Sequence, residues 1–316
     1  MTSKEKYRQL CKQEKSIPIF SQDWWLDTVC GEDKWNVVLI EKNDKIIAVL
    51  PYHYKKKIGL NIILQPPLTQ QLKLWIDYPN NILNHQKTSL LQSVLNELIT
   101  KLPNFKYFSQ CFDYNFNNWM PFYWKGFKQT TKYTYVIENT KNLNFIYNNY
   151  SKSLKQDLRK AKALANVYKG LDLETFYKLN SYSFEKQNIK NPLSFELLNK
   201  IDSQCVKRNC REIIYTKDNE DNVHSAMYIV WDNEYVYCLL GGTDPQFRKS
   251  RSKNLLNVEA INIAHKKELK FNFEGSMIEN VEYFYRQYNC ELIPYFQIEK
   301  VNSRLLKTYF FLKDLL

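Results

Sequence analysis

The chain has 316 residues, of which 44% are hydrophobic and 25% are charged. This length predicts two domains, and the apolar content excludes a disordered chain. Lys and Arg outnumber Asp and Glu by 45 to 33, and the resulting net charge of +12 favours partners that carry phosphate.

Signals for a membrane span, a secretory route or a metal are absent from the sequence. No stretch approaches the ~20 apolar residues of a membrane span, and the N-terminal segment lacks the apolar centre of a secretory signal. The seven cysteines are scattered, and the close pair Cys205 and Cys210 has no histidine nearby to complete a zinc set. We therefore expect a cytoplasmic protein with reduced thiols and no metal site.

Hydrophobic periodicity in the first half predicts a hairpin followed by alternating helices and strands. An aromatic segment at Trp24 and Trp25 comes first. The predicted elements are a hairpin over 37–52 with its turn at Asn43 and Asp44, a strand at 62–64, a helix with an apolar stripe over 90–99, a strand at 105–111, a short helix at 120–125 and a strand at 133–137.

The second half repeats this order. It predicts a hairpin over 212–231, a strand at 235–240, a helix at 252–269, a strand at 271–274, a helix at 279–288 and a strand at 292–298. Gly126 and Asn289 follow the short helix of each half, and both residue types tolerate the left-handed turn that ends a helix. The self-similarity indicates a duplicated unit; the alternative is two unrelated halves that share common βα grammar.

A purely helical stretch is predicted between the halves, over 150–207. Its first helix, at 151–165, places Lys152, Lys155, Arg159 and Lys162 on one stripe. This stripe is either an ordinary solvated face or a positive ridge for the phosphates of a donor or acceptor. We expect a mixed α/β (α+β) fold with an N-terminal module at 1–140, a C-terminal module at 141–300 that contains the helical stretch, and a tail at 301–316 packed on the first module.

The candidate site lies where a strand meets a basic loop. The strand that starts at Tyr235 ends in Gly241 and Gly242, which favour a bulge that leaves backbone groups open to a ligand. The next helix begins near a cluster of cations, and its free N–H groups attract anions. The group is a phosphate receptor in one interpretation and an exposed glycine-rich turn in the other. The expected cofactor-binding residues are Gly241, Gly242, Arg248, Arg251, Ser252, Lys253 and Asn254.

Glu274 is the candidate for acid–base chemistry. It ends the strand in FNFEGSM, and open α/β sheets place their ligands at such strand ends. A carboxylate there accepts a proton from an attacking amine, or, alternatively, it caps the next helix or pairs with Arg286. The second catalytic candidate is Tyr285, and the substrate-binding candidates are Lys155, Arg159, Tyr237 and Arg286. None of the four histidines has a Ser, Cys or Asp at triad spacing, so we expect no covalent enzyme intermediate.

Seven segments carry a family resemblance through their order along the chain. They are IPIFSQDWWLDTVCG, IAVLPYHYKKK, QPPLTQ, WKGFKQTTKYTYVIE, SKSLKQDLRKAKA, CLLGGTDPQFRKSRSKNLLNVEAI and FNFEGSM. In this order the chain resembles the GNAT-superfamily acyltransferases of the FemABX-like type, which are similar to two GNAT modules in tandem. The resemblance implies transfer of an acyl group to an amine by direct attack, without a metal.

The resemblance leaves the donor open between acyl-CoA and aminoacyl-tRNA. GNAT enzymes hold the pyrophosphate of acyl-CoA with a loop R-x-x-G-x-G/A, and in that register Arg251 and Lys253 fill the two glycine positions here. FemABX-like members resemble enzymes that move an amino acid from aminoacyl-tRNA to a cell-wall precursor. We expect an N-acyltransferase with a CoA-type donor; the alternatives are an aminoacyl-tRNA-dependent transferase and a non-catalytic binding protein on the same fold.

Overall fold

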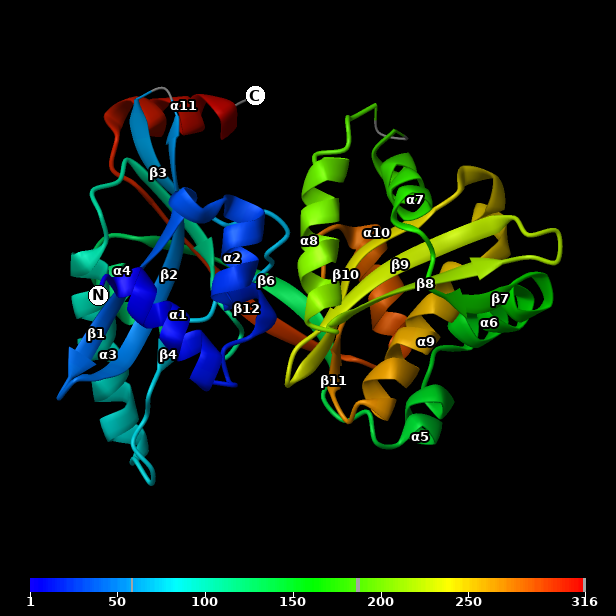
Figure 1. Cartoon of the computed structure of the whole chain (residues 1–316), viewed down its shortest axis with the longest axis horizontal. Coiled ribbons are helices and arrows are strands. Elements are labelled where there is room, and N and C mark those ends of the chain that lie inside the picture. The colour runs from blue at the N-terminus through cyan, green and yellow to red at the C-terminus, as the bar shows by residue number, and fades with distance from the viewer. Residues whose placement is uncertain (58, 186–187, 315–316) are drawn as a thin grey trace. The chain divides into compact units, whose positions relative to one another are not determined.

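The computed structural model describes residues 1–57, 59–185 and 188–314, which fold as two compact units (Figure 1). Unit 1 comprises Met1–Lys132 and Pro294–Leu316, and unit 2 comprises Tyr133–Ile293. The segment 294–300, which sequence reasoning groups with the second module, therefore lies in unit 1.

Unit 1 begins with two helices that the periodicity did not reveal. α1 (Ser3–Gln13) starts at a capping box, in which the Thr2 hydroxyl accepts from the Glu5 amide and the Glu5 carboxylate accepts from the Thr2 amide. α2 (Asp23–Cys30) contains the Trp24 and Trp25 pair, and Trp25 is fully buried. The capping signal T-x-x-E was present in the first five residues.

The sheet of unit 1 has the strand order β1-β2-β3-β5-β12, with β4 paired to β2. β3 and β5 are parallel, and the other neighbours in this order are antiparallel. The remaining elements of the unit are η1 (Ile19–Ser21), η2 (Glu32–Lys34), β1 (Trp35–Lys42), β2 (Lys45–Lys57), β3 (Leu60–Leu64), β4 (Trp75–Ile76), α3 (Asn84–Lys101), β5 (Tyr107–Cys111), α4 (Met120–Trp124), β12 (Glu291–Val301) and α11 (Arg304–Asp314). The predicted hairpin turn is confirmed: Asn43 and Asp44 both have positive φ, as a two-residue turn of this kind requires.

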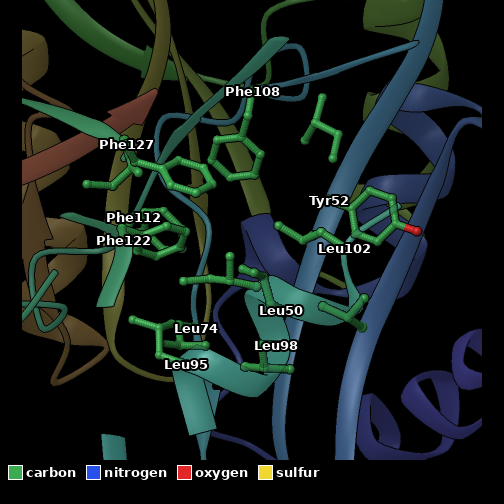
Figure 2. Close-up of a cluster of buried hydrophobic side chains, with 14 of the residues drawn as sticks. Leu50, Tyr52, Leu74, Leu95, Leu98, Leu102, Phe108, Phe112, Phe122 and Phe127 are labelled. Atoms are coloured by element: carbon green, nitrogen blue, oxygen red, sulfur yellow. The ribbon is translucent and has the colours of Figure 1, made fainter. Parts of the chain in front are cut away.

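An aromatic cluster joins α3 and α4 to this sheet. Figure 2 shows Phe108, Phe112, Phe122 and Phe127 facing Leu95 and Leu98, the buried face of α3. Phe122 is fully buried, and its ring centroid lies 4.9 Å from that of Phe127. These contacts fix the short helix α4 rigidly to the core.

The sheet of unit 2 has the strand order β6-β11-β10-β9-β8-β7. The elements are β6 (Lys128–Ile137), which enters from unit 1, α5 (Leu143–Asn148), α6 (Lys152–Leu164), β7 (Asn166–Lys169), α7 (Leu173–Glu185), α8 (Phe195–Lys207), β8 (Arg211–Lys217), β9 (Val223–Trp231), β10 (Tyr235–Thr243), η3 (Pro245–Ser250), α9 (Lys253–Lys266), β11 (Lys270–Asn272), α10 (Glu279–Tyr285) and η4 (Arg286–Tyr288). The expectation of a purely helical stretch over 150–207 is wrong, because β7 pairs with β8 and stacks Tyr168 against Tyr215 at 5.6 Å. Pairing along the sheet edge overrides the helical neighbours here.

Both halves have the predicted element order, but each half ends in a strand that pairs with the other half's elements. β6 follows the first half and pairs with β11 through Val136 and Ile137. β12 follows the second half and pairs with β5 over 297–301. Gly126 and Asn289 both adopt the left-handed conformation that the sequence predicts. In the part of the chain that the structure describes, no helix is long and apolar enough to cross a bilayer.

Candidate functional site

The candidate site of unit 2 lies where β10 parts from β11. These parallel strands pair only through Tyr235–Tyr237 and 270–272, whereas β10 stays paired with β9 as far as Thr243. A bulge between Cys238 and Leu240 marks the point of departure. Past this point the two strands diverge, which leaves room for a ligand to pair with the exposed edge of β10.

The two glycines do not create this opening, contrary to expectation. Gly241 and Gly242 remain in register with Met227 and Ala226 of β9. A Cβ on Gly242 would lie 2.3 Å from the backbone carbonyl group of Leu179 on α7. The glycine therefore admits the backbone of a covering helix, and the strand bends at the bulge three residues earlier.

Four titratable side chains gather at the opening: Cys238, Lys253, Glu274 and Tyr285. Burial raises the pKa of Glu274 to about 8 and lowers the pKa of Lys253. Burial also raises the pKa of Cys238, whose thiol lies close enough to Lys253 and Glu274 to sense both charges. The pKa of Tyr285 is raised, first by burial and then by Cys238 and Glu274. The opening thus holds a carboxyl group and an amine that are both poorly solvated.

A sharp turn of the backbone presents Glu274 at the end of β11. Glu274 has φ of 62° and Gly275 has φ of 49°, both in the left-handed region. A Cβ on Gly275 would lie 2.3 Å from the carbonyl oxygen of Tyr133, so only glycine fits there. The side chain of Asn272 secures the turn by accepting a hydrogen bond from the Glu274 amide at 2.7 Å. Unfavourable backbone conformations of this kind often mark functional sites.

Neither structural alternative for Glu274 is found. α10 begins at Ile278 without a side-chain cap, and the Nε of Arg286 lies 3.9 Å from a carboxylate oxygen of Glu282. Within residues 1–57, 59–185 and 188–314, the Glu274 carboxylate has neither a hydrogen bond nor an ion pair. It is available to a ligand.

The basic loop is held by its own contacts. Asp244 caps η3 by accepting from the Gln246 amide at 2.8 Å. Arg251 occupies the first glycine position of the GNAT register and keeps a glycine-like φ of 58°. Its Nε lies 3.9 Å from Asp157 on α6, which joins the loop to the basic helix. Arg248 is exposed, so its guanidinium group can reach an anion.

Ser252 and Asn254, two of the expected cofactor-binding residues, face inward. Ser252 is 1% exposed, and its hydroxyl lies 2.9 Å from that of Thr216. Asn254 accepts from the Tyr288 hydroxyl at 2.8 Å, and Tyr288 accepts from Asn257 at 3.0 Å. These side chains anchor the start of α9, so they position the opening without facing it.

The four substrate-binding candidates are spread over unit 2. Lys155 donates to the Asn148 carbonyl at 2.8 Å, and Arg159 is exposed on α6. Tyr237 donates to Asp232 at 2.9 Å in the turn before β10, at the end of the strand away from the opening. Arg286 follows Tyr285 directly, and its guanidinium group lies 4.8 Å from the ring of Tyr283.

Sequence reasoning missed Cys238 and assigned Lys253 a different environment. Cys238 is half-buried at the bulge, with its sulfur 4.0 Å from the side-chain oxygen of Asn257. Lys253 extends beside the ring of Phe284, at 5.4 Å, and not into solvent with the loop cations. The residue types gave no signal for either, because a bulge and the packing of a helix start are tertiary features.

Unit 1 contains the corresponding parallel pair, but the chain itself fills the space beyond it. β3 and β5 pair only through Ile62 and Ile63. After β3 ends, the Gln65 side chain accepts from the Cys111 amide at 2.8 Å, and Leu72 donates to the Cys111 carbonyl at 2.9 Å. β4 then pairs with β2. A ligand cannot take these edge positions in unit 1, so the candidate site belongs to unit 2.

The comparisons with known proteins agree with this architecture. The family described as "Acetyltransferase (GNAT) domain" matches residues 148–276. FemX aligns with a TM-score of 0.68 and 13% identity over 94% of this chain and 96% of its own. L-PGS from Bacillus licheniformis aligns with a TM-score of 0.56 and 12% identity over 98% and 96% of the two chains. The C-terminal domain (DUF2156) of a putative lysylphosphatidylglycerol synthetase from Agrobacterium fabrum gives a TM-score of 0.54 and 10% identity over 94% and 92%. Among curated proteins none matches.

The fold and the matched domain define the class of this protein as a GNAT-type N-acyltransferase. Within that class, its two units give it the FemABX-like GNAT fold, as the resemblance predicted. Within the described residues, no group of three or more His, Cys, Asp or Glu side chains is placed to hold a metal ion.

Proposed function

We propose that unit 2 transfers an acyl group from a phosphate-bearing donor of the CoA type to an amine, with Glu274 as the general base. The observation that carries the proposal is the carboxyl group of Glu274. It stands without a protein partner at the divergence of β10 and β11, and burial raises its pKa to about 8. A group with these properties beside an open strand edge suits proton transfer at neutral pH.

The chemical step needs one proton acceptor and one proton donor. The amine nitrogen forms a bond to the acyl carbon while the bond from that carbon to the carrier breaks, and the nitrogen loses a proton. Glu274 takes this proton. Tyr285 keeps its own proton at neutral pH because its pKa is raised, so it is placed to protonate the departing carrier.

The donor would be held mainly by charged side chains. Arg248 and Lys249 are exposed on η3, before the start of α9. Arg251 keeps the glycine-like turn but carries a side chain where a GNAT loop has none, so close backbone approach to a pyrophosphate is hindered. Guanidinium and ammonium groups bind phosphate without such an approach.

A second candidate is transfer of an amino acid from aminoacyl-tRNA to an amine of a cell-wall or cell-surface precursor. It is favoured by a continuous cationic surface: Arg159 and Lys160 are exposed on α6, and the contact between Asp157 and Arg251 brings this helix to the basic loop. Such a surface follows an RNA backbone readily.

Substitution of Glu274→Gln tests the general base. We expect kcat/KM to fall by about 10²–10⁴, because the isosteric amide cannot accept the proton. Transfer to an amine would be measured with acetyl-CoA, longer acyl-CoAs and charged tRNA in parallel. Glu279→Gln is the matched control, because Glu279 is an exposed carboxylate only five residues away and should be neutral.

Two results would contradict the proposal. Unchanged transfer by the Glu274→Gln enzyme would remove Glu274 from the chemistry. If none of these donors yields a product but one of them raises the melting temperature, the chain is a binding protein on a transferase fold.

A further inference from the structure

We propose that α4 of unit 1 docks on the surface of a bilayer that contains anionic lipids. Met120, Tyr123 and Trp124 are spaced i, i+3 and i+4, so they share one face of this helix. Their exposed fractions are 43%, 63% and 56%. Soluble proteins rarely present a contiguous patch of large apolar side chains outside an interaction site. This face of α4, residues Met120, Tyr123 and Trp124, is called the α4 patch.

The α4 patch stands on a rigid base. On the opposite side of the helix, Pro121 and Phe122 are buried, and the ring of Phe122 lies 5.5 Å from that of Phe112 (Figure 2). Tyr123 is held further by an edge contact with Trp119 at 5.5 Å. Because the helix is already ordered, little conformational entropy is lost when the patch binds.

The charge around the α4 patch selects the partner. Residues 114–132 include Lys125, Lys128 and Lys132 but no Asp or Glu, and Asp113 precedes them. Trp and Tyr rings settle at the headgroup level of a bilayer because they join an apolar body to a polar edge. Lysines next to them are attracted to the negative surface of anionic lipids.

A bilayer fits the α4 patch better than RNA does. Single-stranded RNA stacks on aromatic rings along a positively charged groove. Here the lysines border an outward helix face, and Met120 offers no ring for a base to stack on. Glu274 and the opening of unit 2 take no part in this contact, so the membrane proposal and the proposed chemistry stand or fall separately.

Sedimentation with vesicles tests the proposal. We expect the full-length protein to pellet with vesicles of phosphatidylglycerol and phosphatidylcholine but much less with phosphatidylcholine alone. The double variant Tyr123→Ser, Trp124→Ser should bind at least about tenfold more weakly, because two large rings no longer leave water. Lys125→Gln and Lys128→Gln should each weaken binding about fivefold, and added salt should act in the same direction.

Phe145→Ser supplies the matched control. Phe145 is 60% exposed, like the patch rings, but it lines a small cavity together with the carboxylates Glu138 and Glu291. We expect this variant to bind vesicles as the parent protein does. Thermal unfolding of each variant checks that the fold is intact, which the exposure of the substituted rings predicts.

The proposal is overturned if the parent protein ignores anionic vesicles or if the double variant binds them as well as the parent. It is also overturned if the double variant loses self-association in the ultracentrifuge, or RNA binding, while vesicle binding is unchanged.

Discussion

Glu274 combines backbone strain, burial and the lack of a protein partner, and this combination is expensive unless a ligand uses it. The left-handed backbone at Glu274 and Gly275 is unfavourable for the glutamate, and burial disfavours its charged form. The sequence correctly singled out this residue from its place at the end of a strand. It did not reveal the αL turn, because the reason for Gly275 is a close contact with Tyr133, far away in the chain.

Stability should depend on pH through Glu274. Its folded pKa, about 8, lies above the ordinary value of 4.5, so the unfolded chain releases this proton first as the pH rises. Glu274 therefore destabilises the folded state progressively between pH 4.5 and 8. We expect Glu274→Gln to increase the free energy of unfolding by on the order of a few kcal/mol at pH 8.5 and by almost nothing at pH 4.5.

Urea unfolding of the parent protein and of the Glu274→Gln variant at several pH values measures this difference. A difference that stays the same from acid to alkaline pH would show that the carboxyl group of Glu274 titrates normally in the folded protein.

At the scale of elements, the strand–helix order was predictable and the interruption of that order was not. Apolar stripes and turn residues placed α3, α9 and the hairpins correctly. β7 was missed because four residues of edge strand are too short for a periodic signal. Its pairing partner, β8, comes more than forty residues later.

Gly242 offers a test of how α7 covers β10. We expect Gly242→Ala to destabilise the protein by about 3 kcal/mol or more, because the new methyl group would collide with the Leu179 backbone. Gly241→Ala is the control: its methyl group would lie 3.5 Å from the Ala226 carbonyl oxygen, an ordinary contact. Equal unfolding free energies for the two variants would show that α7 does not pack this closely.

At the scale of the whole molecule, one duplicated plan has taken two forms. Both halves lead an antiparallel meander through a helix into a parallel strand, yet residues 65–76 close the divergence in unit 1, whereas unit 2 keeps it open. Sequence self-similarity predicted the duplication. It could not predict this asymmetry or the exchange of β6 and β12, because both depend on where a segment returns in space.

The pH dependence of kcat/KM tests the central claim most directly. With an amine acceptor, the parent enzyme should become more active as the pH rises and should level off above an apparent pKa near 8, where Glu274 has lost its proton. The acceptor's own titration affects the parent and the Glu274→Gln enzyme equally, so only the break near 8 should disappear in the variant. An identical profile for both enzymes would contradict the assignment of Glu274 as the base.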